Sequence, residues 1–411
     1  MQRDTALPGI LYNKQMHVIE ENTSVKAIDP DQLLRGRDML CFSHDWNSDP
    51  LSKTHLMRLL SKDNRILWVN SIGYRAPTAS SKDIKRAWSK IKAATEPVKE
   101  AIPNLFVLSP LAIPAWGKPW IQSLNRQLLV WQIKSAMRKL RFREPINWVF
   151  NPAASVLAGQ LGEAQVIYYC VDEYTAFSGV PTEALINMER SLLRRADLVV
   201  VSAERLLHSK KQYQSNTVLV RHGVDYDHFR QAVLPETEVA EELKSLPRPV
   251  LGYFGLMSED WVDVPLLVKV AERFKHGSLV LLGKVTMDLG QLQAMPNVHI
   301  LGRKAYSTLP GYCKGFDVAL IPFPISEVTL NANPLKAREY LAAGLPTVST
   351  RIPEVEVLEE CGIGAHVDEF IQRIEEALQH PGPDSARSER MKTESWTARL
   401  DDIRRHLAAK S

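Results

Sequence analysis

The alternation of short apolar runs with amphipathic stretches constrains this chain more than any other feature. Apolar runs such as Met39–Ser43 and Val250–Phe254 predict buried strands. Stretches of helical period separate them, among them Gln122–Phe142, Ala153–Leu161 and Glu354–Cys361. Strands that alternate with helices form a parallel sheet with helices on both faces. Because the alternation occurs twice, we predict an α/β chain with two doubly wound, Rossmann-like domains.

A polar segment separates the two occurrences. Residues 234–249 are polar and end in Pro-Arg-Pro, which is the composition of a linker. We therefore expect an N-terminal domain over 1–233, a linker over 234–249, a C-terminal domain over 250–387 and a last amphipathic helix over 388–411. A length of 411 residues also suits two domains. The cleft between two such domains is the usual place for a ligand.

Several classes of protein lack support in this sequence. No run of 18 apolar residues occurs, and the polar segment Met1–Ser24 does not resemble a secretory signal. The four cysteines lie far apart, so we expect no zinc finger, no disulfide scaffold and a reducing, cytoplasmic setting. The fingerprints of dinucleotide-binding domains, P-loops, α/β-hydrolases and zinc proteases are all absent.

Positive charge is concentrated in the first half of the chain. Residues 75–145 carry 14 basic and 4 acidic side chains together with Trp88, Trp116, Trp120 and Trp131. This mixture suits an anionic membrane surface, with residues 81–100 as an interfacial helix, or a solvated helix face with buried aromatic rings. We expect no nucleic-acid partner, because the chain has no known nucleic-acid module and its second half is acidic.

The segment Ile321–Thr350 predicts a site for a nucleoside diphosphate. We expect Asn333 to cap a helix with Pro334 at its first position, so that free backbone amides face the cleft as a phosphate site. Lys336 lies in the first turn, and Glu339 projects from nearly the same face. A carboxylate there can accept both hydroxyls of a ribose. The alternative is that Glu339 is an ordinary solvated helix residue.

Five segments, in this order along the chain, resemble GT-B nucleotide-sugar glycosyltransferases. They are ADLVVVSAERL (196–206), RHGVDYDHF (221–229), PNVHILGR (296–303), NPLKAREYLAAGLPTVST (333–350) and SWTARLDDI (395–403). SHDWNSDPLSKTHLM and YYCVDEY are similar to segments of bacterial surface-polysaccharide enzymes of the teichuronic-acid type. The resemblance implies a donor that is a nucleotide-diphosphate sugar, a lipid-linked or polysaccharide acceptor, and a last helix that returns to the N-terminal domain.

The resemblance assigns donor-binding roles to several residues. Glu339 would bind the ribose, and Asn331 stands where many members carry a glutamate that contacts the transferred sugar. The stretch Gly252–Val264 lacks the basic pair that often binds the diphosphate. We therefore expect Lys336, Arg303 and the backbone amides of Leu330–Leu335 to hold the diphosphate, with Gly255 close to the donor. We expect no cofactor and no metal.

Two groups of polar residues follow strands of the N-terminal domain, where they would face the cleft. Asp172 is our candidate for the base or acceptor anchor, with Glu173 beside it. His44, a second catalytic candidate, precedes Asp45 and Trp46, which we expect to bind the acceptor. The alternatives are that Asp172 caps a helix and that His44 only stabilises its loop.

Three functions are compatible with these features. The first is a cytoplasmic glycosyltransferase, with the inner face of the cell membrane as a candidate partner. A non-catalytic GT-B module that binds a sugar nucleotide or a partner protein is the second. A sugar-nucleotide epimerase is the third, and the basic, tryptophan-bearing N-terminal domain argues against it.

Overall fold

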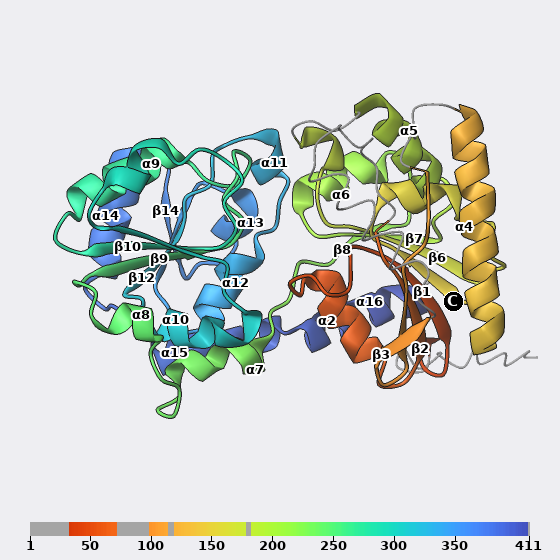
Figure 1. Ribbon diagram of the computed structural model, residues 1–411, viewed down its shortest axis with the longest axis horizontal. Helices are drawn as coiled ribbons and strands as arrows, with labels where there is room; N and C mark the ends of the chain where they lie inside the picture. The colour runs from red at the N-terminus through yellow and green to blue at the C-terminus, as the bar shows by residue number, and fades with distance from the viewer. Residues whose placement is uncertain (1–32, 72–97, 114–118, 178–181, 410–411) are drawn as a thin grey trace, which may run out of the picture.

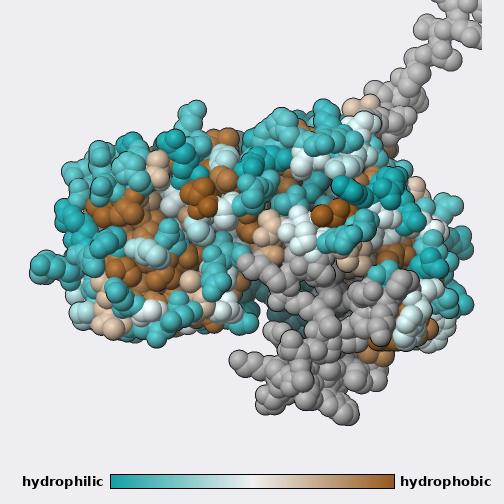
Figure 2. All heavy atoms as spheres, turned by 90° about the horizontal axis from the view of Figure 1, so that it is seen from above, coloured by the Kyte–Doolittle hydropathy of each residue, from teal (hydrophilic) through white to brown (hydrophobic). Residues whose placement is uncertain are grey.

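The structure, a computed structural model, describes residues 33–71, 98–113, 119–177 and 182–409. Two lobes stand side by side, and each contains one sheet (Figure 1). In the space-filling view from above, hydrophilic residues cover much of both lobes, and hydrophobic residues gather on the C-terminal lobe at the left (Figure 2). The predicted α/β class with two doubly wound sheets is confirmed.

The N-terminal sheet has eight strands in the order β3-β4-β2-β1-β5-β6-β7-β8, and only β3 is antiparallel. Alternate residues of β1 enter two cores on opposite faces. Leu40 and Phe42 pack with helices α4 and α5, whereas Met39 and Cys41 pack with α2 and α16. The strands are β1 (Asp38–Phe42), β2 (Arg65–Val69), β3 (Lys99–Ile102), β4 (Leu105–Leu108), β5 (Ile146–Val149), β6 (Gln165–Cys170), β7 (Leu198–Val201) and β8 (Thr217–Leu219). The helices are α2 (Ser52–Leu60), α4 (Pro119–Leu140), α5 (Thr182–Leu193), α6 (Glu204–Lys211) and α16 (Trp396–Ala408).

The C-terminal sheet has six parallel strands in the order β11-β10-β9-β12-β13-β14. Its central strands are apolar throughout because helices cover both faces. The strands are β9 (Val250–Phe254), β10 (Ser278–Leu282), β11 (Val298–Gly302), β12 (Val318–Ile321), β13 (Thr347–Thr350) and β14 (Cys361–Gly364). The helices are α7 (Tyr226–Phe229), α8 (Glu241–Lys244), α9 (Val264–Arg273), α10 (Leu309–Gly315), α11 (Glu327–Leu330), α12 (Leu335–Ala342), α13 (Pro353–Glu356), α14 (Val367–Ala377) and α15 (Ser385–Arg390).

The chain crosses between the lobes twice, and the two crossings pair with each other. The backbone N–H of Val224 donates to Glu394, and the N–H of Trp396 donates back to Val224. Val224 and Leu243 already belong to the C-terminal core, so the change of lobe lies ahead of the boundary expected at residue 233. The helix expected over 388–411 is two helices, α15 and α16, and α16 packs against the N-terminal sheet.

Other elements differ from the sequence-based expectation for local reasons. The stretch Ala153–Leu161 contains a short 3-10 helix, Pro152–Val156, instead of an α-helix. The run expected as a helix over Glu354–Cys361 gives only α13, and its last residue starts the edge strand β14. The expected interfacial helix over 81–100 lies for the most part outside the described residues, as do Trp88 and Trp116.

No helix within the described ranges is both long enough and apolar enough to cross a membrane.

Candidate active site

A cavity of about 730 Å³ lies between the two lobes. It opens at the carboxyl ends of both sheets, because residues directly after β6, β9, β10 and β12 line it. A volume of this size is typical of small-molecule sites. Two aromatic contacts close one side, with the ring of Trp261 6.0 Å from Phe177 of the other lobe and 5.2 Å from Phe323. The cleft expected between the domains is therefore a real cavity.

The first turn of α12 forms the wall of the cavity on the C-terminal lobe. Pro334, Leu335, Lys336 and Glu339 all line it. Burial raises the pKa of Glu339 to about 7, and nearby Lys336 opposes that shift. Burial also lowers the pKa of Lys336. Two opposite charges thus share one partly desolvated helix end, where backbone amides favour an anion.

Asn333 lines the cavity but does not cap α12 as expected. The helix starts at Leu335, and the residue before it, Pro334, has no capping side chain. The Asn333 side chain instead donates to the carbonyl of Ser202 in the other lobe at 2.7 Å and accepts from Arg338 at 2.7 Å. Asn333 therefore ties the start of α12 to the N-terminal lobe.

Gly255 makes room for Lys336. Its φ is +144°, and an added Cβ would lie 2.1 Å from Cε of Lys336. The ammonium of Lys336 is held 5.7 Å from the ring centre of Tyr253 and 5.6 Å from that of Phe323. Any side chain at Gly255 would therefore force the end of the Lys336 side chain to move.

Asp172 and Lys53 form the facing wall on the N-terminal lobe. Asp172 follows β6, and Lys53 lies in the first turn of α2. Burial raises the pKa of Asp172 to about 6, although the ammonium of Lys53 lowers it. Burial lowers the pKa of Lys53, and the Asp172 carboxylate raises it. The two side chains interact electrostatically, and both line the cavity, where a ligand can contact them.

The residues after β1 that were expected at the cleft do not line the cavity. His44 contacts Ser43 at 3.0 Å through Nδ1, and burial lowers its pKa to about 3. Asp45 accepts a hydrogen bond from a backbone amide, and Trp46 packs edge-on against Trp68, with 5.0 Å between ring centres. The following residues, 47–53, line the cavity in their place.

Two further candidates also lie outside the cavity wall. Glu173 accepts a hydrogen bond from the Lys210 ammonium at 2.7 Å. Asn331 donates to the backbone carbonyl of Glu327 at 2.7 Å. Both side chains are therefore occupied by contacts within their own lobes.

Two cations that were not expected from the sequence add to the site. Lys53 and Lys284 line the cavity together with Arg303, which forms a two-point ion pair with Asp49 across the cleft. Lys284 could have been predicted at the cleft, because a Gly-Lys pair directly follows the strand Ser278–Leu282. Lys53 had a weaker signal, a lysine at the start of the first helix after a strand.

Known proteins share this fold and part of this sequence. Residues 248–380 match the family described as glycosyl transferases group 1. A Bacillus subtilis protein named as the teichuronic acid biosynthesis glycosyltransferase TuaH is 22% identical over 286 residues, which are 63% of this chain and 70% of that protein.

Solved structures resemble the chain along most of its length. Sucrose-phosphate synthase from Thermosynechococcus elongatus has a TM-score of 0.64 and 15% identity, over 91% of this chain and 100% of that one. HepE of Anabaena in complex with UDP-glucose has a TM-score of 0.61 and 12% identity, over 90% and 99% of the two chains. These comparisons confirm the resemblance seen in the sequence: the chain is a glycosyltransferase of the GT-B fold, and most of its C-terminal lobe matches the group 1 glycosyl transferase family.

Proposed function

We propose that this glycosyltransferase moves a sugar from a nucleotide-diphosphate sugar to a lipid-linked or polysaccharide acceptor in cell-surface polysaccharide biosynthesis. One observation carries the proposal: a single cavity brings Lys336 and Glu339 of one lobe opposite Asp172 of the other. The similarity to a teichuronic acid enzyme supports the polysaccharide role.

The donor would bind along the first turn of α12. The carboxylate of Glu339 suits the two ribose hydroxyls, and Lys336 with the helix amides suits the diphosphate. Because HepE was solved with UDP and with UDP-glucose, a uridine nucleotide is the first donor to test.

The chemistry follows from the charges around the cavity. The bond between the anomeric carbon and the diphosphate oxygen breaks, and the acceptor oxygen bonds to that carbon. Lys336, Lys53 and Lys284 stabilise the negative charge that develops on the leaving diphosphate. We assign the proton of the acceptor hydroxyl to Asp172, whose pKa of about 6 leaves most of it ionised at neutral pH.

We further propose that transfer needs no metal ion, because lysines and a helix end can hold the diphosphate. Activity measured in EDTA should equal activity in Mg²⁺ or Mn²⁺. Loss of activity in EDTA that either ion restores would contradict this part of the proposal.

A thermal-shift panel of nucleoside diphosphates and their sugars tests the donor site. The wild-type protein at 100 times the dissociation constant should gain about 2.7 kcal/mol. Glu339→Ala should lose the shift, whereas Glu272→Ala on the outer face of α9 should keep it. No shift with any nucleotide would refute the donor site, and binding without transfer would favour the non-catalytic alternative.

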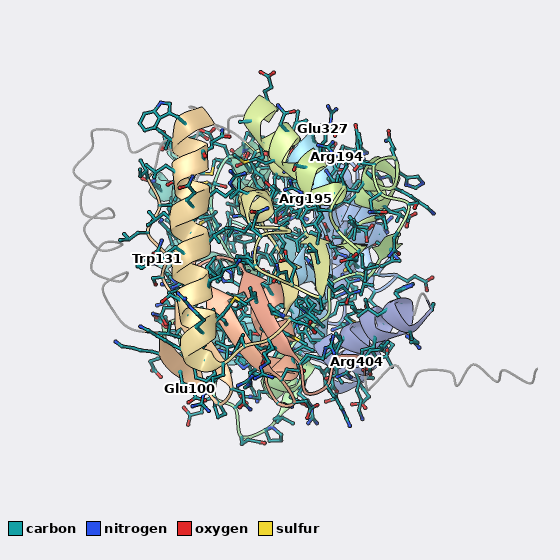
Figure 3. All side chains as sticks on the ribbon, turned by 90° about the vertical axis from the view of Figure 1, so that its right-hand side faces the viewer. Glu100, Trp131, Arg194, Arg195, Glu327 and Arg404 are labelled. Carbon is teal, nitrogen blue, oxygen red and sulfur yellow. The ribbon has the colours of Figure 1, made fainter. Side chains whose placement is uncertain are left out.

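We also propose that the N-terminal lobe contacts an anionic lipid surface on the inner face of the cell membrane. Helix α4 supports this, because it carries four basic residues and no acidic one. Trp120 and Trp131 are each 64% exposed, and Leu124 is 44% exposed. Trp131 projects from α4 away from the sheet (Figure 3). Tryptophan and leucine can enter the lipid interface while the basic residues attract anionic headgroups.

Sedimentation with lipid vesicles tests this contact. The wild-type protein should bind vesicles that contain phosphatidylglycerol and not vesicles of phosphatidylcholine, and salt should weaken binding. Trp120→Ala with Trp131→Ala should release the protein, and Tyr213→Ala, a matched change at a residue 47% exposed on the same lobe, should not. If the double tryptophan variant bound these vesicles as well as Tyr213→Ala does, α4 would not be the lipid-binding helix.

A further inference from the structure

His222 is a buried histidine at the cavity that the mechanism above does not use. It lies between β8 and α7, where the chain passes from one lobe to the other. The residue is 5% exposed and lines the cavity. Its Nε2 atom has no hydrogen-bond partner among the described residues. A buried polar atom at a ligand cavity without a partner needs an explanation.

The hydrogen bond on the other side of the ring decides what Nε2 can do. Nδ1 of His222 lies 2.9 Å from the backbone carbonyl oxygen of Asn333. A carbonyl oxygen only accepts, so Nδ1 carries the proton and donates it. Burial, together with the charges of Arg338 and Lys53, lowers the pKa of the ring to about 3. The ring is therefore neutral, and Nε2 is a hydrogen-bond acceptor.

The position of His222 relative to α12 identifies the ligand group that it faces. Along α12, Glu339 comes one turn after Lys336, and Asn333, which holds His222, comes before the helix begins. A ribose at Glu339 and a diphosphate at Lys336 therefore place the next group of the donor beside His222. In a nucleotide sugar that next group is the sugar, and its hydroxyls are hydrogen-bond donors.

The position of Asn331 also supports a sugar contact at His222. This asparagine stands at the position that the family resemblance assigns to the transferred sugar, but its side chain is bonded to Glu327 and does not line the cavity. His222, in contrast, lines the cavity. His222 can therefore supply the sugar contact that Asn331 does not.

We propose that Nε2 of His222 accepts a hydrogen bond from a hydroxyl of the transferred sugar and so contributes to the choice of donor. This inference rests on the proposed function, because it requires a nucleotide sugar in the cavity. Trp396, 5.7 Å from the imidazole between ring centres, and the carbonyl of Asn333 fix the orientation of the ring. A site built around one hydroxyl discriminates against sugars that lack it.

Two substitutions at His222 and one control test the contact by titration calorimetry. The probes are UDP, ADP and GDP with UDP-glucose, ADP-glucose and GDP-mannose, and the pair that binds the wild-type protein most tightly is used. His222→Asn keeps a donor for the Asn333 carbonyl and removes the Nε2 acceptor. His222→Gln places an amide near the position of Nε2. His208→Asn, on the exposed face of α6, is the matched control.

The expected result is a change specific to the sugar. His222→Asn should raise the dissociation constant of the nucleotide sugar about tenfold and that of the nucleoside diphosphate less than about twofold. His222→Gln should recover part of the loss, and His208→Asn should match the wild type. Equal weakening of both ligands would indicate a purely structural role and overturn the proposal.

Two other results separate this proposal from the proposed function. If the wild-type protein binds a nucleoside diphosphate and the sugar adds nothing to affinity, the His222 contact is refuted and the donor site stands. If the wild-type protein binds no nucleotide, the proposed function itself fails.

Discussion

Glutamine in place of Glu339 gives the sharpest test of the donor site. Glu339 must be ionised to accept hydrogen bonds from both ribose hydroxyls, yet burial raises its pKa to about 7. A nucleotide must therefore compete with a proton for this carboxylate. The variant removes the proton and the charge while it keeps the shape of the side chain.

The raised pKa sets the size of the effect. With a pKa of about 7, about 90% of Glu339 is ionised at pH 8 and about 10% at pH 6. Because affinity falls with the competent fraction, the dissociation constant should rise about tenfold between pH 8 and pH 6. Glu339→Gln cannot ionise, so its dissociation constant should not change with pH. That constant should equal or exceed the one that the wild-type protein shows at pH 6.

Calorimetry with UDP-glucose provides the assay. Both phosphates of this ligand are esterified, so it does not titrate in this range, whereas the terminal phosphate of UDP would. A wild-type curve that stays flat between pH 6 and pH 8 would refute the reasoning. The same tenfold slope in Glu339→Gln would refute it as well, because another group would then be responsible.

The same shift changes the stability of the free protein. The folded state holds the Glu339 proton more tightly than the unfolded chain, so stability falls as the pH rises from about 4.5 to about 7. Glutamine removes this loss, and Glu339→Gln should be more stable than the wild type at pH 8 by at most about 3 kcal/mol. Urea unfolding at pH 5 and pH 8 measures the difference, and a variant less stable at pH 8 would contradict the direction.

Two further predictions concern the walls of the cleft. Gly255→Ala should weaken nucleotide binding about tenfold or more, because its Cβ displaces Lys336, while Gly290→Ala, whose added Cβ meets open space, should bind like the wild type in the same titration. Arg221→Ala should lower the free energy of unfolding in urea by about 3 kcal/mol, because it removes the cation that lies 2.7 Å from the carboxylate of Glu354, which is 2% exposed. Among the described residues, the carboxylate then keeps only uncharged donors, the Glu204 backbone amide and the Asn333 side chain. A loss below about 0.5 kcal/mol would show that this carboxylate is held by its other contacts.

Strands buried on both faces were predictable because their composition alone specifies them. The run predicted as Val250–Phe254 has the same bounds as β9, and the run predicted as Met39–Ser43 differs from β1 by one residue at each end. Two of the edge strands, β3 and β14, gave no such signal. Strand β3 is a charged and exposed segment, and β14 contains two glycines, so each depends on pairing with its neighbour.

In the site, pairs of residues close in the sequence were predictable, and contacts between residues far apart in the sequence were not. Lys336 and Glu339 could be paired from the sequence because one helix turn places them together. The position of Lys53 depends on how the loop after β1 folds. The position of His222 depends on a contact with Asn333, more than a hundred residues away. No spacing rule covers such contacts, and the rule that strand ends face the cleft selected His44 instead.

Because α16 returns to the N-terminal lobe, the two lobes are completed at different times during synthesis. The ribosome completes every strand of the C-terminal sheet before it makes α16. Until then, α2 alone among the described helices of the N-terminal lobe packs on this face of the sheet, and the part that receives Trp396, Leu400, Ile403 and Leu407 remains uncovered. The lobe that is begun first is therefore finished last, and a chain released before Ser395 would expose an apolar face that invites aggregation.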